Sequence, residues 1–237
     1  MRIMLIGYGK MGKTIEQIAL QRGHQIVAKI DIQNTDDIGK NPCDVAIEFT
    51  NPKSAVNNLI NCFNHQIKVV CGTTGWLSQL PDVIDFCNSK NGSLLYASNF
   101  SIGVNIFFEI NKRLASLMYK QATYNVHIEE IHHTAKLDAP SGTAITLAEE
   151  IMTYYSTFES WINEVSTNPN ELSIISQRVD NVPGTHTIFY DSLVDSIELK
   201  HTAHTRVGFA LGAVVAAEWL ANKQGVFTMQ DVLQLNI

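Results

Sequence analysis

Short apolar runs alternate with amphipathic segments over the first hundred residues of the chain. The runs end at glycine or polar residues, as is typical of buried strands in a parallel sheet, and they cover residues 3–6, 25–31, 44–49, 68–71 and 93–96. The segments between them carry apolar residues at helical spacing and predict helices over 14–22, 54–63 and 77–87. This alternation predicts an α/β fold, a Rossmann-type parallel sheet with helices on both faces.

Beyond residue 100 the helical segments become longer. Helical spacing predicts a helix over 104–119, with an apolar side formed by Ile106, Phe107, Ile110, Leu114 and Leu117. The same periodicity predicts helices over 143–155 and 206–221, the last of which is rich in alanine and glycine.

Strand patterns separated by polar turns also occur in this second half. They cover residues 124–131, 173–178, 185–190 and 196–201. These strands predict an α+β domain with an open mixed or largely antiparallel sheet, while the polar residues 158–171 match no pattern. We therefore expect one domain of residues 1–103 and 206–237, and a second domain of residues 104–205.

The composition narrows the class of protein. With 237 residues, 45% hydrophobic and 17% charged, the chain can bury a core without a metal or a disulfide. Its net charge of −6 argues against nucleic-acid binding, and no apolar stretch approaches the roughly 18 residues needed to span a membrane. The four cysteines form no C-x-x-C pair, which predicts reduced, mostly buried thiols and a cytoplasmic protein.

A glycine-rich turn follows the first predicted strand. It matches G-x-G-x-x-G and consists of Gly7, Tyr8, Gly9, Lys10, Met11 and Gly12. The first glycine permits a tight turn, the second lets backbone N–H groups approach a pyrophosphate, and the third lets helix and strand pack closely. The helix start adds N–H donors and the positive end of its dipole. The turn predicts a dinucleotide site; the alternative is a glycine-rich turn without a ligand.

An acidic residue closes the second predicted strand. Asp31 follows the glycine turn by about 20 residues, the distance at which a carboxylate can hydrogen-bond the adenosine ribose hydroxyls. Such a carboxylate repels the 2′-phosphate of NADP, whereas Lys10 inside the turn attracts it. The balance favours NADH with NADPH tolerated, and the alternative for Asp31 is an ordinary turn residue.

Two further turns lie at the carboxyl ends of predicted strands, where doubly wound sheets bind ligands. The candidate cofactor contacts in them are Gly72, Thr73 and Thr74 in the first and Ala97, Ser98, Asn99 and Phe100 in the second. Both turns offer backbone N–H groups and small polar side chains for the nicotinamide and its ribose. Plain turn chemistry is the alternative.

Ionisable residues are concentrated at the end of another predicted strand. His132, His133 and Lys136 supply a proton carrier that works near neutral pH and a fixed cation. Gly142 and Thr143 then open a helix, whose start offers N–H and hydroxyl donors to a carboxylate. Together these groups suit a small dicarboxylate that accepts a proton.

Two other interpretations of this segment remain open. The histidine pair by itself is compatible with an ordinary surface position. A metal site would use Glu129 or Glu130 with either histidine, but a third ligand is not obvious and Lys136 would oppose a cation, so we expect no metal. His201 and His204 are interpreted as polar residues at a strand end.

The segment that begins at His132 resembles the signature of the 4-hydroxy-tetrahydrodipicolinate reductase (dihydrodipicolinate reductase) family. The matching residues are His132-His133, Lys136 and Asp138-Ala139-Pro140-Ser141-Gly142-Thr143-Ala144. The resemblance continues through residues 44–50, 72–75, 98–105 and 206–213, and so covers most of the chain.

The resemblance implies an activity and an assembly. The family reduces a cyclic, unsaturated dicarboxylate made from 4-hydroxy-tetrahydrodipicolinate, using NADH or NADPH, in the diaminopimelate route to lysine. Its members are usually homotetramers whose second-domain sheets associate and whose domains close around a hinge. The resemblance thus implies a dinucleotide-binding first domain and a substrate-binding, oligomerising second domain.

It also implies roles for individual residues. His132 falls at the position of a proton donor or acceptor, and Lys136 falls at the position of a proton donor. His133 matches a substrate-binding position, while Gly142 and Thr143 match the pair that holds a substrate carboxylate. Residues 72–74 and 97–100 match segments that contact the cofactor.

Some features depart from the family pattern. The first turn is one residue shorter than usual between its first two glycines, and Lys10 replaces the usual arginine. Ile32, rather than a basic residue, follows Asp31, which weakens the case for a strong NADPH preference.

Two alternatives to a reductase of this family remain open. One is another two-domain nicotinamide dehydrogenase that acts on an amino or keto acid, and the other is a non-catalytic NAD-binding regulator.

Overall fold

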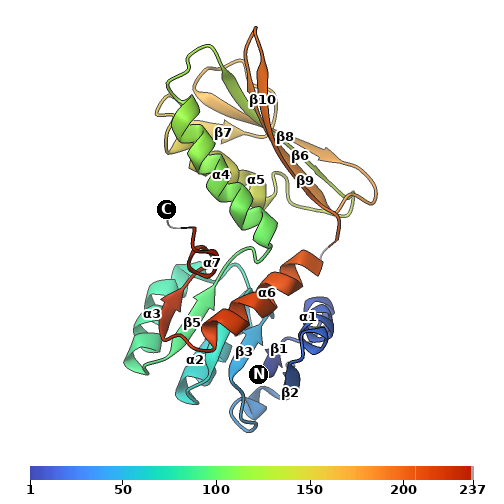
Figure 1. Cartoon of the computed structure of the whole chain (residues 1–237), viewed down its shortest axis with the longest axis vertical. Coiled ribbons are helices and arrows are strands. Elements are labelled where there is room, and N and C mark those ends of the chain that lie inside the picture. Colours follow the sequence, from blue (N-terminus) through green and yellow to red (C-terminus); the bar gives the residue numbers. More distant parts are fainter. Residues whose placement is uncertain (206, 236–237) are drawn as a thin grey trace. The chain divides into compact units, whose positions relative to one another are not determined.

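A computed structural model describes residues 1–205 and 207–235. These residues form two compact units (Figure 1). Unit 1 comprises Met1–Asn105 together with the segment from Val207 onwards, and unit 2 comprises the described residues from Ile106 to 205. The long helix α4 (Ile102–Met118) crosses the boundary between the units. Arg206, where we expected the last long helix to begin, lies outside the described residues.

Unit 1 is built on a fully parallel sheet, as predicted, with the strand order β11-β5-β4-β3-β1-β2. The strands are β1 (Arg2–Ile6), β2 (Gln25–Ile30), β3 (Val45–Glu48), β4 (Lys68–Cys71), β5 (Ser93–Tyr96) and β11 (Gly225–Phe227). Alternate residues of β1 enter different cores: Ile3 and Leu5 pack on one face of the sheet, and Met4 and Ile6 on the other. Burial on both faces explains why these strands are continuous apolar runs.

Helices cover both faces of this sheet. The helices α1 (Lys10–Gln21), α6 (Val207–Leu220) and α7 (Met229–Leu233) form the first core with Ile3. The helices α2 (Pro52–Asn64) and α3 (Leu80–Ser89) form the second core with Met4. Short 3-10 turns, η1 (Thr35–Asp37) and η2 (Leu77–Gln79), connect these elements. All strands therefore direct their carboxyl ends to one edge, where the predicted cofactor residues follow them.

Unit 2 contains a five-stranded sheet with the order β10-β9-β6-β8-β7. Its strands are β6 (Asn125–His132), β7 (Ser160–Ile162), β8 (Glu171–Arg178), β9 (Gly184–Asp191) and β10 (Ser196–Ala203). Two neighbouring pairs are antiparallel and two are parallel, so the sheet is mixed, which is one of the two forms that the sequence predicts. Three-residue β7, in the segment without a pattern, adds one of the parallel pairs.

Two helices pack on one face of the second sheet (Figure 1). They are α4 and α5 (Gly142–Met152), and they share a core with Ile128, Ile174 and Ile188 of the three central strands. Because β6 alternates, Glu130 and His132 point to the same face as Ile128.

The predicted apolar side of α4 was partly wrong. Phe107 is buried, but Ile106, Ile110 and Leu117 are 40–55% exposed. The buried side continues instead through Asn111, Ala115 and Met118. Asn111 faces the core because its amide donates to the Leu147 carbonyl and the Glu150 carboxylate of α5, which a count of apolar residues does not reveal.

Other expectations concern the cysteines and membranes. All four cysteines are free thiols, and three of them, Cys62, Cys71 and Cys87, are buried as predicted. Across residues 1–205 and 207–235, the structure contains no helix with the length and apolar character of a membrane span.

Candidate active site

The glycine turn in unit 1 has the geometry that its motif predicts. Gly7 has a φ of +94°, and a Cβ there would lie 2.0 Å from the Phe49 carbonyl oxygen. A Cβ on Gly12 would lie 2.2 Å from the Gly7 carbonyl oxygen, so the third glycine allows α1 to pack against the turn. A Cβ on Gly9 would meet no atom within 4 Å. Gly9 is thus not required for packing, and its backbone is open to a ligand.

A cavity of about 280 Å³ lies beside this turn. Gly7, Gly9 and Asp31 all line it, together with residues from the end of β3. Lys10, Met11 and Gly12 form the first turn of α1, where backbone N–H groups have no partner within the helix. The structure thus brings the glycine turn and Asp31 together around one cavity, an arrangement that fits a dinucleotide.

A cluster that the sequence did not reveal lies next to the turn. Lys29, on β2, places its Nζ 2.7 Å from a Glu16 carboxylate oxygen and 4.5 Å from the centre of the Tyr8 ring. The Tyr8 hydroxyl donates a hydrogen bond to Glu16. The hydrogen bond with Glu16 raises the pKa of Lys29. This lysine is therefore already paired with a carboxylate, beside the position expected for the adenosine ribose.

The two other predicted turns follow β4 and β5 at the same sheet edge. A Cβ on Gly72 would collide with the Phe49 ring at 2.1 Å. The Thr73 hydroxyl accepts a hydrogen bond from the Thr50 N–H at 2.7 Å, which ties this turn to the end of β3. Thr74 is exposed. The first turn is thus held by its neighbours while Thr74 remains accessible.

The second turn contains both accessible and buried positions. Ala97 is half-buried, Ser98 is exposed, and the Asn99 side chain accepts a hydrogen bond from the Ser101 N–H at 2.9 Å. Phe100 is 2% exposed and its ring packs against Phe49. The Phe100 side chain is therefore part of the core, and only its backbone is suited to a cofactor contact.

In unit 2, His132 lies at the end of β6 beside a buried carboxylate. The His132 Nδ1 is 3.2 Å from Glu130 Oε2, and the Glu130 side chain is fully buried. The His186 ring, from β9, meets the His132 ring edge-on with centroids 5.0 Å apart. The predicted proton carrier is thus a side chain that is only 9% exposed and has a fixed acidic neighbour.

Glu130 is surrounded by donors. Its carboxylate accepts hydrogen bonds from the Ser141 N–H at 3.1 Å, the Ser176 hydroxyl at 2.8 Å and the Arg178 guanidinium at 3.3 Å. Burial alone would raise the pKa of Glu130, but its close contacts with His132 and His186 and the hydrogen bonds from the two serines outweigh burial and hold the pKa far below its usual range. Glu130 is therefore a buried, ionised carboxylate.

Lys136 lies in the loop that follows β6. Its Nζ is 2.8 Å from both carboxylate oxygens of Asp138. The hydrogen bond with Lys136 lowers the pKa of Asp138. Arg178 donates to the Asp138 carbonyl oxygen at 2.6 Å, so the loop is fastened to β8. His133 begins this loop, and its carbonyl accepts a hydrogen bond from the Lys136 N–H.

The predicted carboxylate site lies at the start of α5. Ser141 is the N-cap, and its hydroxyl accepts a hydrogen bond from the Ala144 N–H at 3.2 Å. Gly142 and Thr143 are the first two helical residues, so their N–H groups have no partner within the helix. A Cβ on Gly142 would meet no atom within 4 Å, which leaves room for a ligand there.

Sequence analysis did not assign three members of this cluster: Ser176, Arg178 and His186. They come from β8 and β9, far along the chain, and strand register brings them to β6. Ser176 and His186 lie opposite Glu130, and Arg178 lies opposite His132. The sequence shows that these residues alternate with apolar ones, but it does not show the register in which β8 and β9 pair with β6.

Glu130, His132 and His186 also form a possible metal-ligating group, with ligand atoms within 4.8 Å of one another. His186 on β9 is thus the third possible ligand, which the sequence did not reveal. The Arg178 guanidinium, however, lies 3.3 Å from the same carboxylate and opposes a second cation. The serine and N–H donors occupy its remaining lone pairs. The donor set fits an anion held by hydrogen bonds better than a metal.

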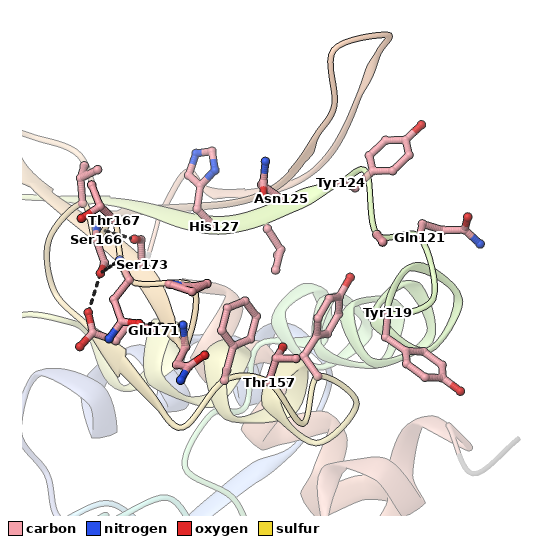
Figure 2. A pocket seen from close by; sticks show the side chains of 18 of the residues that line it. Tyr119, Gln121, Tyr124, Asn125, His127, Thr157, Ser166, Thr167, Glu171 and Ser173 are labelled. Carbon is pink, nitrogen blue, oxygen red and sulfur yellow. Dashed lines mark hydrogen bonds between the residues drawn. The ribbon is translucent and has the colours of Figure 1, made fainter.

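A larger cavity of about 840 Å³ lies elsewhere in unit 2 (Figure 2). Tyr124, Asn125 and His127, from the start of β6, line one side, and Thr157 lies across from them. Ser166 and Glu171 are hydrogen-bonded at its margin. None of the predicted site residues lines this cavity, which adjoins the opposite end of β6 from His132.

Comparison with known proteins gives a consistent result over the whole chain. Residues 1–100 match the family model described as dihydrodipicolinate reductase, N-terminus, and residues 103–233 match that of its C-terminus. The chain is 52% identical over 235 residues to 4-hydroxy-tetrahydrodipicolinate reductase from Christiangramia forsetii, covering 98% of each chain. It is 32% identical to the Neisseria meningitidis protein of that name, covering 93% of this chain and 84% of the relative.

The fold is similar to solved structures. A dipicolinate-bound dihydrodipicolinate reductase from Paenisporosarcina aligns with a TM-score of 0.80 at 21% identity, covering 96% of this chain and 97% of that one. A probable dehydrogenase from Thermotoga maritima aligns with a TM-score of 0.57 at 11% identity, covering 99% and 93%. These likenesses concern the fold alone.

Proposed function

Because the chain belongs to the dihydrodipicolinate reductase family, we propose that it is a 4-hydroxy-tetrahydrodipicolinate reductase. It reduces the cyclic unsaturated dicarboxylate formed from 4-hydroxy-tetrahydrodipicolinate to tetrahydrodipicolinate. The observation that carries this proposal is the buried Glu130–His132 pair beside the exposed N–H groups of α5. One end of unit 2 thereby combines a proton carrier with a carboxylate site.

Unit 1 is the proposed cofactor unit. The open backbone at Gly9 and the start of α1 bind the pyrophosphate, and Asp31 binds the adenosine ribose. Residues 72–74 and 97–100 contact the nicotinamide half. When bound, reduced nicotinamide supplies a hydride to the substrate ring.

Unit 2 is the proposed substrate unit. The N–H groups of Gly142 and Thr143 hold one substrate carboxylate, and His133 contributes to binding. The Nδ1 of His132 is engaged by Glu130, so its Nε2 is the atom suited to exchange a proton with substrate. Lys136 supplies a second proton donor or a cation for the other carboxylate. A general acid of this kind contributes roughly 10²–10⁴-fold to rate.

We propose that the protein uses NADH in preference to NADPH. Asp31 repels a 2′-phosphate, and Ile32 offers it no positive charge. Lys29 is already paired with Glu16 at 2.7 Å, so it is a poor partner for the phosphate. Lys10 remains as a weak attraction, which allows NADPH to be used.

The biological setting follows from the same proposal. The enzyme acts in the diaminopimelate route to lysine, in the cytoplasm, as a homotetramer whose unit 2 sheets associate. Leu193 and Val194 in the turn between β9 and β10 are about nine-tenths or more exposed, which favours coverage by another copy.

A coupled assay tests the function. The substrate is generated from pyruvate and aspartate semialdehyde by the preceding enzyme, and loss of the absorbance of reduced nicotinamide is followed. We expect rapid loss that depends on the substrate, and a higher kcat/KM with NADH than with NADPH. Protein that binds NADH but shows no such loss would refute the reductase assignment.

A further inference from the structure

We propose that Glu130 is a positioning residue that fixes both the proton carrier His132 and the carboxylate-binding start of α5. The inference rests on the proposed function, because it concerns the same site. It assigns a role to a side chain that touches neither substrate nor cofactor. The Glu130 carboxylate thereby holds both the group that delivers the proton and the backbone that binds the substrate carboxylate.

A charged carboxylate is costly at the buried position of Glu130. The Glu130 side chain is 0% exposed, and a buried charge is tolerated only when its hydrogen-bond partners compensate for the lost water. Replacing a whole buried cluster of paired charges by apolar residues of similar volume is often neutral or stabilising. Folding alone therefore does not require an ionised Glu130, whereas a function in orienting charged and titratable neighbours does.

The second argument is the contact with His132. The Glu130 carboxylate lies 3.2 Å from His132 Nδ1, and this ion-pair contact favours one orientation of the ring. The Nε2 then points toward β9, where a Cβ on Gly184 would lie only 3.0 Å away. Glycine at this position leaves space beside the atom that exchanges the proton.

The other charged and titratable groups around His132 are consistent with this. Burial lowers the pKa of His186 and outweighs its contact with Glu130, so His186 stays neutral and adds no second charge. Arg178, from β8, lies against Glu130 at 3.3 Å, and Lys136 in the loop is paired with Asp138. Glu130 is thus the carboxylate that directly contacts His132.

The third argument is the contact with α5. The N–H of Ser141 donates to both oxygens of Glu130, at 3.1 and 3.2 Å. Ser141 is the residue directly before Gly142 and Thr143, whose N–H groups bind the substrate carboxylate. Its hydroxyl also lies 3.0 Å from His186 Nε2. A shift of the Glu130 carboxylate therefore moves the helix start as well as the histidine.

A fourth contact extends the support to the loop. Arg178 shares its guanidinium between Glu130 and the carbonyl oxygen of Asp138. Asp138 in turn binds Lys136. Both proposed proton donors are therefore connected to the same carboxylate, one directly and one through Arg178.

The test is Glu130→Gln, which keeps the size of the side chain and removes its charge. We expect kcat to fall roughly 10- to 100-fold, KM for the dicarboxylate to rise several-fold, and the Kd for NADH to stay unchanged. Glu130→Asp, which retains the charge, should recover part of kcat.

The matched control is Glu129→Gln. It makes the same charge change one residue away on β6, where the alternation of the strand directs the side chain to the other face of the sheet. It should leave kcat and KM unchanged. Equal behaviour of the two variants would overturn the proposal, as would a Glu130→Gln enzyme that loses only thermal stability.

Two further measurements keep the proposal testable. If Glu130→Gln does not fold, Ser176→Ala removes one hydrogen bond from the same carboxylate, and it should lower kcat several-fold; wild-type kinetics would overturn the proposal. Binding of pyridine-2,6-dicarboxylate (dipicolinate) separates this inference from the proposed function. If the wild-type protein shows no turnover but binds dipicolinate several-fold more tightly than Glu130→Gln, the proposed function is refuted and the positioning role is supported. If the two proteins bind dipicolinate equally, the positioning role is overturned.

Discussion

Two glutamates, Glu48 in unit 1 and Glu130 in unit 2, occupy similar places and have different surroundings. Both are fully buried near the carboxyl ends of strands, β3 and β6. The partners of Glu48 are neutral: the Thr50 hydroxyl, the Asn58 amide at 3.3 Å and the Cys71 thiol at 3.1 Å. The partners of Glu130 include two histidines and an arginine.

The difference shows how one residue type serves two purposes. The Glu48 cluster ties β3, α2 and β4 together and holds the turns that line the proposed cofactor cavity. It contains no group that exchanges protons near neutral pH. The Glu130 cluster contains two such groups, the imidazoles of His132 and His186. Unit 1 thus needs rigid turns, and unit 2 needs controlled proton positions.

The largest expected effect comes from removing the group that Glu130 supports. His132→Gln should lower kcat about 10²- to 10⁴-fold, because it deletes a proton carrier in the transition state. The Kd for NADH, measured by fluorescence titration, should stay within a factor of about two because His132 belongs to the other unit. A variant with full kcat and altered NADH affinity would place His132 in the cofactor site instead.

A change in unit 1 should act on the cofactor alone. Asp31→Asn should weaken NADH binding roughly 10-fold, because a charge-assisted hydrogen bond to the ribose contributes about 1.5–3 kcal/mol. It should also narrow the gap between NADH and NADPH, because the repulsion of the 2′-phosphate is removed. Comparison of kcat/KM for both cofactors checks this, with Asp36→Asn in η1 as a control. An unchanged ratio would exclude Asp31 from cofactor selection.

Stability at acid pH tests whether Glu130 is ionised in the folded protein. Glu130 has a pKa held below its ordinary 4.5, so its contribution to the free energy of unfolding is present above about pH 4.5 and is lost as the pH falls below it. Glu130→Gln should therefore flatten the loss of stability on acidification. Urea unfolding at several pH values measures this effect. Glu130→Gln with the same acid dependence as wild type would show that Glu130 is not ionised by its neighbours.

The smallest expected effect concerns Glu150 on α5. Burial raises its pKa to about 7, although Asn111 donates a hydrogen bond that lowers it. Its folded pKa is therefore higher than its unfolded pKa, and stability is lost as the pH rises from about 4.5 to 7. Glu150→Gln should raise the free energy of unfolding at pH 8 by about 1 kcal/mol, allowing for partial exposure. Glu149→Gln, its neighbour on α5, is the control; equal changes would contradict this account.

Much of the fold could be predicted because the strands of unit 1 are buried on both faces. The apolar runs at residues 68–71 and 93–96 match β4 and β5 without error. The helix α1 begins four residues earlier than predicted, because Gly12 has a low helix propensity. The missing Cβ of Gly12 is nevertheless what allows α1 to pack against the glycine turn. The three-residue strands β7 and β11 are too short to show a period.

The candidate site was predictable only where its residues are adjacent in sequence. The segment from His132 to Thr143 carries its own signature, and the glycine turn carries another. Arg178 and His186 reach Glu130 through the pairing of β6 with β8 and β9, which depends on long-range register. No local pattern specifies that register.

The central claim is that a hydride passes from the cofactor to a cyclic dicarboxylate. The most direct test uses NADH deuterated at both C4 positions, with substrate generated by the preceding enzyme and the product analysed by mass spectrometry. The account predicts that tetrahydrodipicolinate gains one deuterium per NADH oxidised in the wild-type enzyme, with much slower formation in His132→Gln. A product without deuterium, or NADH oxidation that does not require the dicarboxylate, would contradict it.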